Sequence, residues 1–157
     1  MSRRKNAYRA KPCVCGSKTL YRECCGRFHR AFEQGSEWDP NPEQLMRSRY
    51  SAYALGMVEY VIATTLPNSE AWRDDDTVWR DSLRAFAREF HFAGVEVLGV
   101  EPQEGTDSPE AAWVTFRAIL RRGAKDRSFT ERSQFSRKDG RWFYSGGRVS
   151  DEDESNP

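Results

Sequence analysis

An α+β fold is predicted by three features of this 157-residue sequence. Apolar side chains recur at helical spacing between residues 41 and 91. From Val95 onward the period shortens to two, which is typical of strands with one buried face. Residues 13–25 differ from both regions, because they contain all four cysteines of the chain. We therefore expect a small cysteine module, followed by helices packed on one face of an antiparallel sheet.

Changes in composition divide the chain into five segments. Gly35 and Pro40 interrupt regular structure after the cysteines. The acidic run Asp151–Glu154 is typical of a solubilising end. The expected segments are a flexible basic arm (1–12), the cysteine module (13–30), a linker (31–41), an α+β domain (42–149) and an acidic disordered tail (150–157). We expect the domain to have its own core, from Met46 to Tyr144, separate from the module.

Three helices are expected in the domain. Asn41 can cap the first helix with its side-chain oxygen, Pro42 suits the first helical position, and Gly56 breaks the helix. The last helix carries an apolar stripe at helical spacing. The expected helices run to about Leu55, from Met57 to Thr65, and from an Asp76 cap to about His91, with the stripe Trp79, Leu83, Phe86 and Phe90.

Antiparallel strands are expected in the second half of the domain. Apolar residues alternate with other residues there, and Asp139-Gly140 is a strong signal for a two-residue hairpin turn. The expected strands are Val95–Val100, Val114–Arg121, Phe129–Phe135 and a returning strand that contains Trp142 and Tyr144. Together they form a meander that the helices cover on one face.

Cys13, Cys15, Cys24 and Cys25 are the candidate metal ligands. Their spacing, Cys-x-Cys-x8-Cys-Cys, brings four sulfurs onto two short segments. Four thiolates at about 2.3 Å complete a tetrahedral zinc shell, which is typical of a structural site. Disulfides are the alternative, but the adjacent pair could close only a strained vicinal bond. Zinc is the metal we expect, and iron is possible because it also accepts four thiolates.

Local signals predict how the module holds these ligands. Gly16 allows a tight turn after the first two cysteines. Ser17 can cap a short helix over residues 18–25, which Gly26 would end. His29 is expected on the surface, because four sulfurs already complete the metal shell.

Positive charge is concentrated at the N-terminus. Residues 1–30 contain nine Lys or Arg and one acid, Glu23, whereas the rest of the chain is acidic overall. The basic module can bind the phosphates of RNA or a ribosome. The alternative is a solvated arm whose charge offsets that of a zinc tetrathiolate. The candidate contacts for an anionic partner are Arg3, Arg4, Lys5, Arg9 and Lys11.

Strand periodicity directs the carboxylate of Glu131 towards the core. Glu131 shares a strand face with Phe129 and Phe135, and an unpaired buried carboxylate is costly. We expect a structural ion pair with Arg49 or Arg47 on the first helix. The alternative is a general base in a pocket, although the sequence shows no second acid or base beside it.

The N-terminal residues resemble the SEC-C motif. The similarity lies in Cys13-Val14-Cys15-Gly16-Ser17, in Tyr21 and in Cys24-Cys25-Gly26. Val14 and Lys18 stand where that motif usually has Pro and Gly, which affects loop shape and leaves the ligands intact. The motif forms the metal-binding tail of the bacterial preprotein-translocase ATPase. There it contacts ribosomes and a secretory chaperone, which implies a similar role here.

Four further segments resemble the YchJ-like family, so that the resemblance covers roughly residues 12–148. These segments are residues 45–53, Ala63-Thr64, residues 130–135 and residues 140–144. The resemblance implies a cone-shaped domain of the nuclear-transport-factor-2-like, or cystatin-like, type, with helices packed into a strongly curved sheet. It implies no established activity.

The function expected from these features is that of a non-enzymatic zinc-binding adaptor in the cytoplasm. The stretch Ala54–Leu66 is too short to span a membrane, and residues 1–12 do not resemble an export signal. The expected partner is a ribosome, a nascent chain or a protein-export component. The alternative is a small-molecule-binding protein or enzyme that uses a cone pocket near Glu131. A deep, polar-lined pocket would favour this alternative, and a filled aromatic core would favour the adaptor.

Overall fold

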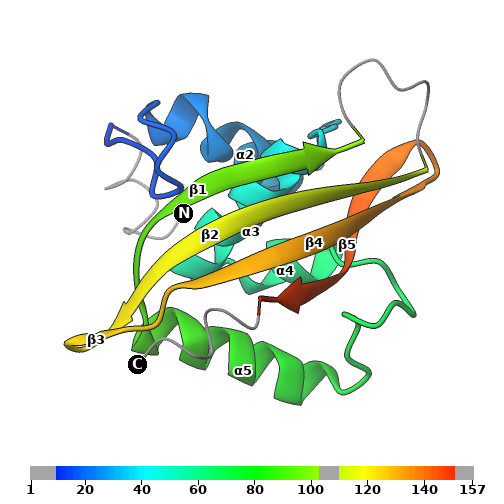
Figure 1. Cartoon of the computed structure of the whole chain (residues 1–157). Coiled ribbons are helices and arrows are strands. Elements are labelled where there is room, and N and C mark those ends of the chain that lie inside the picture. The colour runs from blue at the N-terminus through cyan, green and yellow to red at the C-terminus, as the bar shows by residue number, and fades with distance from the viewer. Residues whose placement is uncertain (1–9, 103–109, 151–157) are drawn as a thin grey trace.

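The computed structural model describes residues 10–102 and 110–150. The described chain folds into helices followed by an antiparallel sheet, so the predicted α+β class is confirmed (Figure 1). The elements are a 3-10 turn η1 (Tyr21–Glu23), α2 (Cys25–Gln34), α3 (Pro42–Leu55), α4 (Val58–Ala63), α5 (Asp76–Glu89), β1 (His91–Glu101), β2 (Ala111–Arg122), β3 (Lys125–Asp126), β4 (Phe129–Lys138) and β5 (Arg141–Val149).

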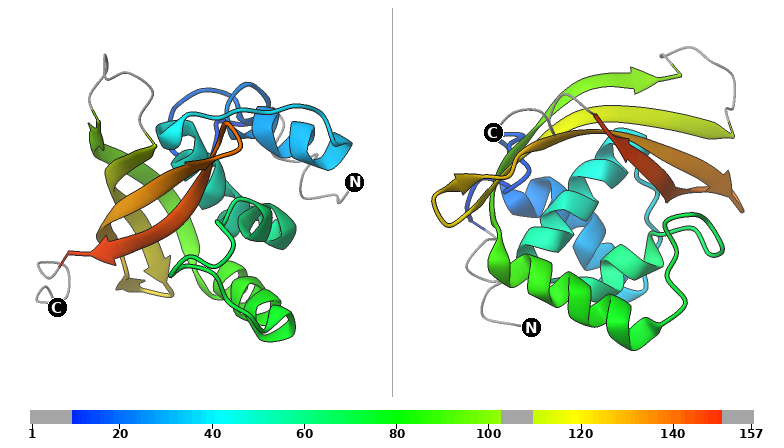
Figure 2. Two further views of the ribbon diagram at one scale, coloured as in Figure 1. Left: turned by 90° about the vertical axis from the view of Figure 1, so that its right-hand side faces the viewer. Right: turned by 60° about the horizontal axis from the view of Figure 1, so that its bottom comes forward.

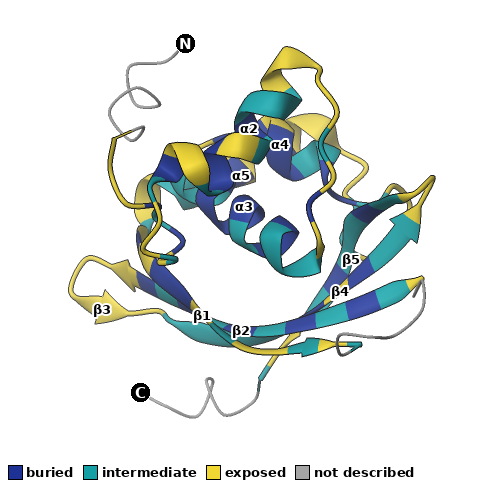
Figure 3. Ribbon diagram, turned by 90° about the horizontal axis from the view of Figure 1, so that it is seen from above, coloured by how far each residue is buried: buried dark blue, intermediate teal, exposed yellow. Residues whose placement is uncertain are grey.

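The sheet is strongly curved and holds the helices on its concave side. Its strands follow the order β1-β2-β4-β5, every neighbouring pair is antiparallel, and the short β3 pairs with β2. Register shifts interrupt the ladders at Phe92/Gly94, Val97/Gly99 and Gln134/Phe135. Such bulges bend and twist a strand. The sheet consequently arches around α3, which lies in its hollow (Figures 2 and 3).

Helix α3 begins and ends where the sequence predicts. The Asn41 side chain accepts a hydrogen bond from Gln44 N, and the Gln44 side chain accepts one from Asn41 N, both at 2.9 Å. Gly56 ends the helix in a left-handed conformation. The cap of α5 is Asp75 and not Asp76: Asp75 Oδ1 accepts from Val78 N at 3.0 Å, so the helix begins at the residue that we expected to cap it.

The strands confirm the predicted alternation. The buried residues of β2 include Val114, Phe116, Ala118 and Leu120. Asp139 and Gly140 both have positive φ, at 52° and 76°, as the predicted two-residue turn requires. The first strand is longer than predicted, because the chain is already extended at Phe90 and enters β1 at His91.

The module differs from the helix predicted over residues 18–25. Lys18 has a φ of 70°, and only a 3-10 turn precedes the α-helix, which begins at Cys25 and ends at Gln34, with Gly35 as its C-cap. Gly26 therefore lies inside α2 and does not end it. A Cβ on Gly26 would lie 2.6 Å from Tyr21 O, so this glycine permits the close contact between α2 and the turn before it. Residues 31–34 of the expected linker are helical.

One hydrophobic core joins the module to the domain. It contains side chains from the cysteine loop, η1, α2, α3 and the four strands β1, β2, β4 and β5, so the domain shares this core with the module, where we expected a separate one. Its buried members include Cys13, Cys15, Tyr21 and Cys25 together with Leu45, Met46, Phe92, Val114, Phe116, Phe135 and Trp142. A second cluster of buried residues lies between α3, α4 and α5. In the described part of the chain, no helix is both long and apolar enough to cross a membrane.

Candidate functional sites

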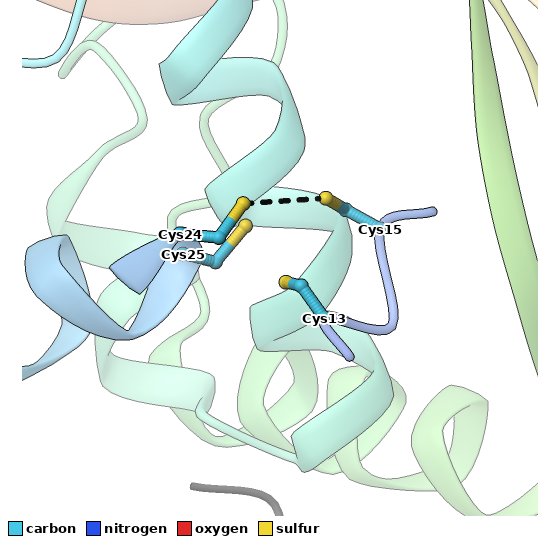
Figure 4. A group of neighbouring side chains, drawn as sticks. All are labelled: Cys13, Cys15, Cys24 and Cys25. Carbon is cyan, nitrogen blue, oxygen red and sulfur yellow. Dashed lines mark hydrogen bonds between the residues drawn. The ribbon is translucent and has the colours of Figure 1, made fainter. Parts of the chain in front are cut away.

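The four cysteines lie together at the junction of the N-terminal loop and α2. All four sulfur atoms are within 4.8 Å of one another, and Cys15 Sγ is 3.7 Å from Cys24 Sγ (Figure 4). The edges of a tetrahedron with zinc–sulfur bonds of about 2.3 Å measure roughly 3.8 Å. The spacing of these sulfurs therefore fits one tetrahedral metal ion.

Backbone hydrogen bonds shape the loop that presents the first two cysteines. Cys13 N donates to Thr19 O at 2.8 Å, and Gly16 N donates to Cys13 O at 3.1 Å. Gly16 has a φ of +84°, which confirms the expected tight turn. The other two cysteines stand at the start of α2, with Cys24 in the N-cap position. The positive end of a helix dipole favours thiolates there.

The thiol groups perturb one another strongly. Hydrogen bonds, chiefly from Cys13, lower the pKa of Cys15, and a hydrogen bond from Cys13 lowers the pKa of Cys24 to about 6. The pKa of Cys13 is raised mainly by its hydrogen bond to Cys15, and that of Cys25 mainly by its hydrogen bond to Cys13. A bound dication would replace the shared protons and let all four sulfurs be thiolates.

Arg47 of α3 faces the cysteine centre and not Glu131. Its Nη1 lies 3.3 Å from Cys15 O and 3.6 Å from Cys15 Sγ, and its Nε lies 3.3 Å from Glu43 Oε2. Burial would lower the pKa of Arg47, but its contacts with Cys15 and Glu43 raise it overall. The expected Arg47–Glu131 pair is therefore wrong, and Arg47 instead offsets negative charge on sulfur.

Two hydroxyl groups complete the surroundings of the sulfurs. Ser51 Oγ, one turn after Arg47 on α3, lies 3.6 Å from Cys13 Sγ. Ser17 Oγ lies 3.1 Å from Cys24 Sγ, so its role is to contact a sulfur, where we expected a helix cap. Each hydroxyl can donate to a thiolate. The domain thus provides part of the surroundings of the four sulfurs through α3.

His29 is buried, which contradicts its expected place on the surface. It is 2% exposed, because α2 continues past Gly26 and turns the ring towards α3. Its Nε2 lies 2.8 Å from Ser48 O, which can only accept, so we assign the proton to Nε2. Nδ1 then accepts from the Tyr21 hydroxyl at 2.6 Å. Both nitrogens are engaged, and neither is free to bind a metal.

Two glycines let the cysteine loop sit directly on β1. A Cβ on Gly16 would lie 3.4 Å from Gly94 Cα. Beside this contact, Val95 N donates to Cys15 O at 3.0 Å, and Gly94 N donates to the Tyr50 hydroxyl at 2.8 Å. The loop is thereby tied to both the sheet and α3.

A cavity of about 390 Å³ lies between α3, α5 and the concave face of the sheet. Its walls are mostly aromatic and apolar, with Arg49, Ser82, Glu131, Ser133 and Tyr144 as the polar exceptions. A second hollow of about 690 Å³ shares four of its lining residues and continues towards the loop after α4. The cone is therefore not a completely filled aromatic core.

Glu131 lines this cavity, as its strand position predicts, but its partners are hydroxyl groups. Its Oε2 accepts hydrogen bonds from Ser133 Oγ and, at 3.2 Å, from the Tyr144 hydroxyl. Burial and then the negative charge of Glu131 raise the pKa of Tyr144. Arg49 makes no ion pair with Glu131, because the Tyr144 ring stacks against the guanidinium group, with Arg49 Cζ 4.3 Å from the ring centroid. The expected Glu131–Arg49 pair is wrong.

Most of the basic arm lies outside the described residues. This applies to Arg3, Arg4, Lys5 and Arg9, and also to the acidic run 151–154. Lys11 is described and exposed.

The curved sheet with enclosed helices and the N-terminal cysteine cluster define a class: NTF2-like proteins that carry a SEC-C motif. A family model described as the middle NTF2-like domain of YchJ matches residues 41–147. The chain belongs to the YchJ-like family, and the resemblance found in the sequence is confirmed.

Two solved structures are similar over nearly the whole chain. A SEC-C motif-containing protein from Rhodopseudomonas palustris is 36% identical, with a TM-score of 0.70, and the match covers 89% of this chain and 99% of that one. A SEC-C motif-containing protein from Psychrobacter arcticus is 26% identical, with a TM-score of 0.74, and the match covers 92% of this chain and 85% of that one. The combination of module and cone thus recurs in both.

Proposed function

We propose that this protein binds a small molecule in its cone cavity and uses its cysteine centre as a structural zinc site. The cavity of about 390 Å³ carries this proposal. Its size falls in the range of ligand sites, which combine apolar walls with a few convergent polar groups. Protein interiors rarely keep large empty voids, because unfilled volume forfeits packing energy.

The cysteine centre fits a structural role better than a catalytic one. Four sulfurs fill a tetrahedral shell and leave no position for substrate. Three of the four cysteines are buried, and the same residues belong to the hydrophobic core. Zinc suits this donor set, and we place the protein in the cytoplasm, where clustered thiols stay reduced.

Ligand binding can be tested by filling the cavity. Ala118 lines it and is 1% exposed, so Ala118→Leu should reduce the available volume. Ala111→Leu on the opposite face of the same strand is the matched control. We expect ligand-observed NMR to find small apolar molecules that bind the wild type and the control, and that bind Ala118→Leu roughly tenfold more weakly. An absence of binders, or equal binding by all three proteins, would contradict the proposal.

A second candidate function is an adaptor that docks on an anionic partner, for which a ribosome is the choice that the SEC-C motif implies. The described residues of the arm and the module support it with four exposed cations and one exposed acid, Glu23. The cations are Lys11, Lys18, Arg22 and Arg27. Phosphate contacts of such side chains weaken steeply with salt.

Ribosome co-sedimentation at several salt concentrations tests this candidate. The triple variant Lys18→Glu/Arg22→Glu/Arg27→Glu should lose most of the salt-sensitive binding. The control carries two charge reversals outside the module, Arg121→Glu and Lys125→Glu, and should co-sediment as the wild type does. Binding that does not depend on salt, or that survives the triple change, would rule out this docking surface.

A further inference from the structure

Arg49 is a buried cation in the wall of the cavity. Its side chain comes from α3 and is 6% exposed. In the described part of the chain its hydrogen-bond partners are all neutral: Val61 O at 2.9 Å, Thr64 Oγ1 at 2.7 Å and Thr65 Oγ1 at 3.1 Å. A buried charge without an opposite charge is costly. Arg49 therefore has a charge that a ligand can balance.

One edge of the Arg49 guanidinium group makes no hydrogen bond within the described residues. All three of those hydrogen bonds leave from Nη1, so Nε and Nη2 make none with residues 10–102 and 110–150. Across the same residues, the one fully buried side-chain nitrogen or oxygen without a partner is Arg137 Nε. The Nε–Nη2 edge of Arg49 is therefore accessible, and Arg49 lines the cavity and the second hollow that continues from it. Two parallel N–H groups on one edge match the two oxygens of a carboxylate.

The orientation of this guanidinium group is fixed before any ligand arrives. Nη1 is held at the end of α4, and the Tyr144 ring lies against the guanidinium plane. A preorganised fork loses little conformational freedom on binding. Arg49 is thus both charged and positioned for one geometry.

The remaining walls specify the rest of the ligand. Phe86, Phe92, Phe116, Phe129 and Phe135 line the cavity and favour an apolar or aromatic body. Glu131, which accepts a hydrogen bond from the Tyr144 hydroxyl, supplies a negative charge in the same cavity. This charge repels a second carboxylate and leaves the Arg49 end as the favourable place for the first.

We propose that the cavity binds an apolar monocarboxylate, with the carboxylate on Nε and Nη2 of Arg49 and the hydrocarbon body against the phenylalanine wall. This inference rests on the proposed function, namely that the cavity is a ligand site.

Calorimetry on the full chain with its metal bound tests the inference with three matched probes. Hydrocinnamate carries the carboxylate, hydrocinnamyl alcohol is its neutral counterpart, and phenylsuccinate adds a second carboxylate. We expect hydrocinnamate to bind roughly tenfold or more tightly than either other probe. Arg49→Lys keeps the charge but loses the fork, and should weaken hydrocinnamate binding about tenfold. Arg88→Lys on the exposed side of α5 is the control and should change nothing.

The outcomes separate the two levels of the proposal. If the alcohol binds as tightly as the acid, or Arg49→Lys has no effect, the carboxylate inference is wrong and the cavity remains a ligand site. If no probe binds, and ligand-observed NMR finds no small molecule that binds Ala118→Leu more weakly than the wild type, both the carboxylate inference and the proposed function are wrong. If Arg49→Lys does not fold, the affinities of the wild type for the three probes still decide whether the cavity prefers a single carboxylate.

Discussion

Arg47 Nη1 and Cys15 Sγ lie 3.6 Å apart, which places a cation from the first helix of the cone directly beside the cysteine centre. A charge-assisted contact of this kind stabilises a thiolate and orients its lone pairs towards a metal. The cone therefore contributes to the electrostatics of the cysteine centre, although all four sulfurs come from the N-terminal segment.

Removing this cation should weaken metal binding. Arg47→Gln keeps a polar side chain but loses the charge beside Cys15, so we expect the affinity for zinc to fall roughly tenfold. Competition with a chromophoric chelator measures this change. Arg84→Gln on α5, which breaks an exposed contact with Asp81, is the matched control. Equal affinities in the two variants would show that Arg47 does not support the site.

The metal content should be one ion per chain, bound by four sulfurs. The four Sγ atoms already have the spacing of a tetrahedral shell, and His29 is occupied on both nitrogens. Elemental analysis gives the stoichiometry and distinguishes zinc from iron, and X-ray absorption gives the ligand type. Protein without metal, or a spectrum dominated by nitrogen and oxygen ligands, would contradict the assignment of the centre.

Loss of the metal should destabilise the whole chain and not only the module. Cys13, Cys15 and Cys25 belong to the same core as Leu45 and Phe116, so disorder in the loop removes packing from the cone. For Cys24→Ser we expect one cooperative transition, with a melting temperature lower by roughly 10 °C, or about 3 kcal/mol for a domain of this size. Calorimetry that shows an unchanged cone transition would mean that the module and cone unfold independently.

Glu131→Gln should have a small effect on stability. The change removes the negative charge from the group that accepts hydrogen bonds from Ser133 and Tyr144. The expected loss of stability is about 1 kcal/mol, because the glutamine amide oxygen can still accept both hydrogen bonds. A buried ion pair with Arg49 would instead give a loss of roughly 3–5 kcal/mol. Urea denaturation distinguishes the two. A second readout is the pKa of Tyr144, which should fall once the neighbouring negative charge is gone.

Local features of the fold could be predicted from the sequence, because a few adjacent residues determine them. Asn41 and Gln44 cap α3 through each other's backbone, and Asp139 with Gly140 forms a turn that needs positive φ at both positions. Cysteine spacing likewise brought the four sulfurs into one cluster. Each of these features depends on contacts between close neighbours in the chain.

Features that depend on how side chains and elements pack were not predictable in the same way. Glycine is typical of helix ends, so the sequence predicts that Gly26 ends a helix. Only the packing against Tyr21 shows that Gly26 lies inside α2 and permits a close contact with the preceding turn. The period of the strand predicts that Glu131 faces the inside of the cone, but it does not predict which residue forms a hydrogen bond with Glu131. The choice of Tyr144 depends on the register shift at Gln134/Phe135, which sets Tyr144 opposite Phe135. The presence of Tyr144 on the returning strand was the one sequence signal that pointed to this partner of Glu131.

The common core has a consequence for the boundaries of this protein. The family model begins at residue 41, whereas the packed interior begins at Cys13. A fragment limited to residues 41–147 would expose the side of α3 that contacts the module. On this side Ser48 O accepts a hydrogen bond from His29, and Ser51 Oγ contacts Cys13 Sγ. Such a fragment would expose a hydrophobic surface to water and would tend to self-associate. The segment that the family model covers is thus smaller than the segment that must be present to give a stable molecule.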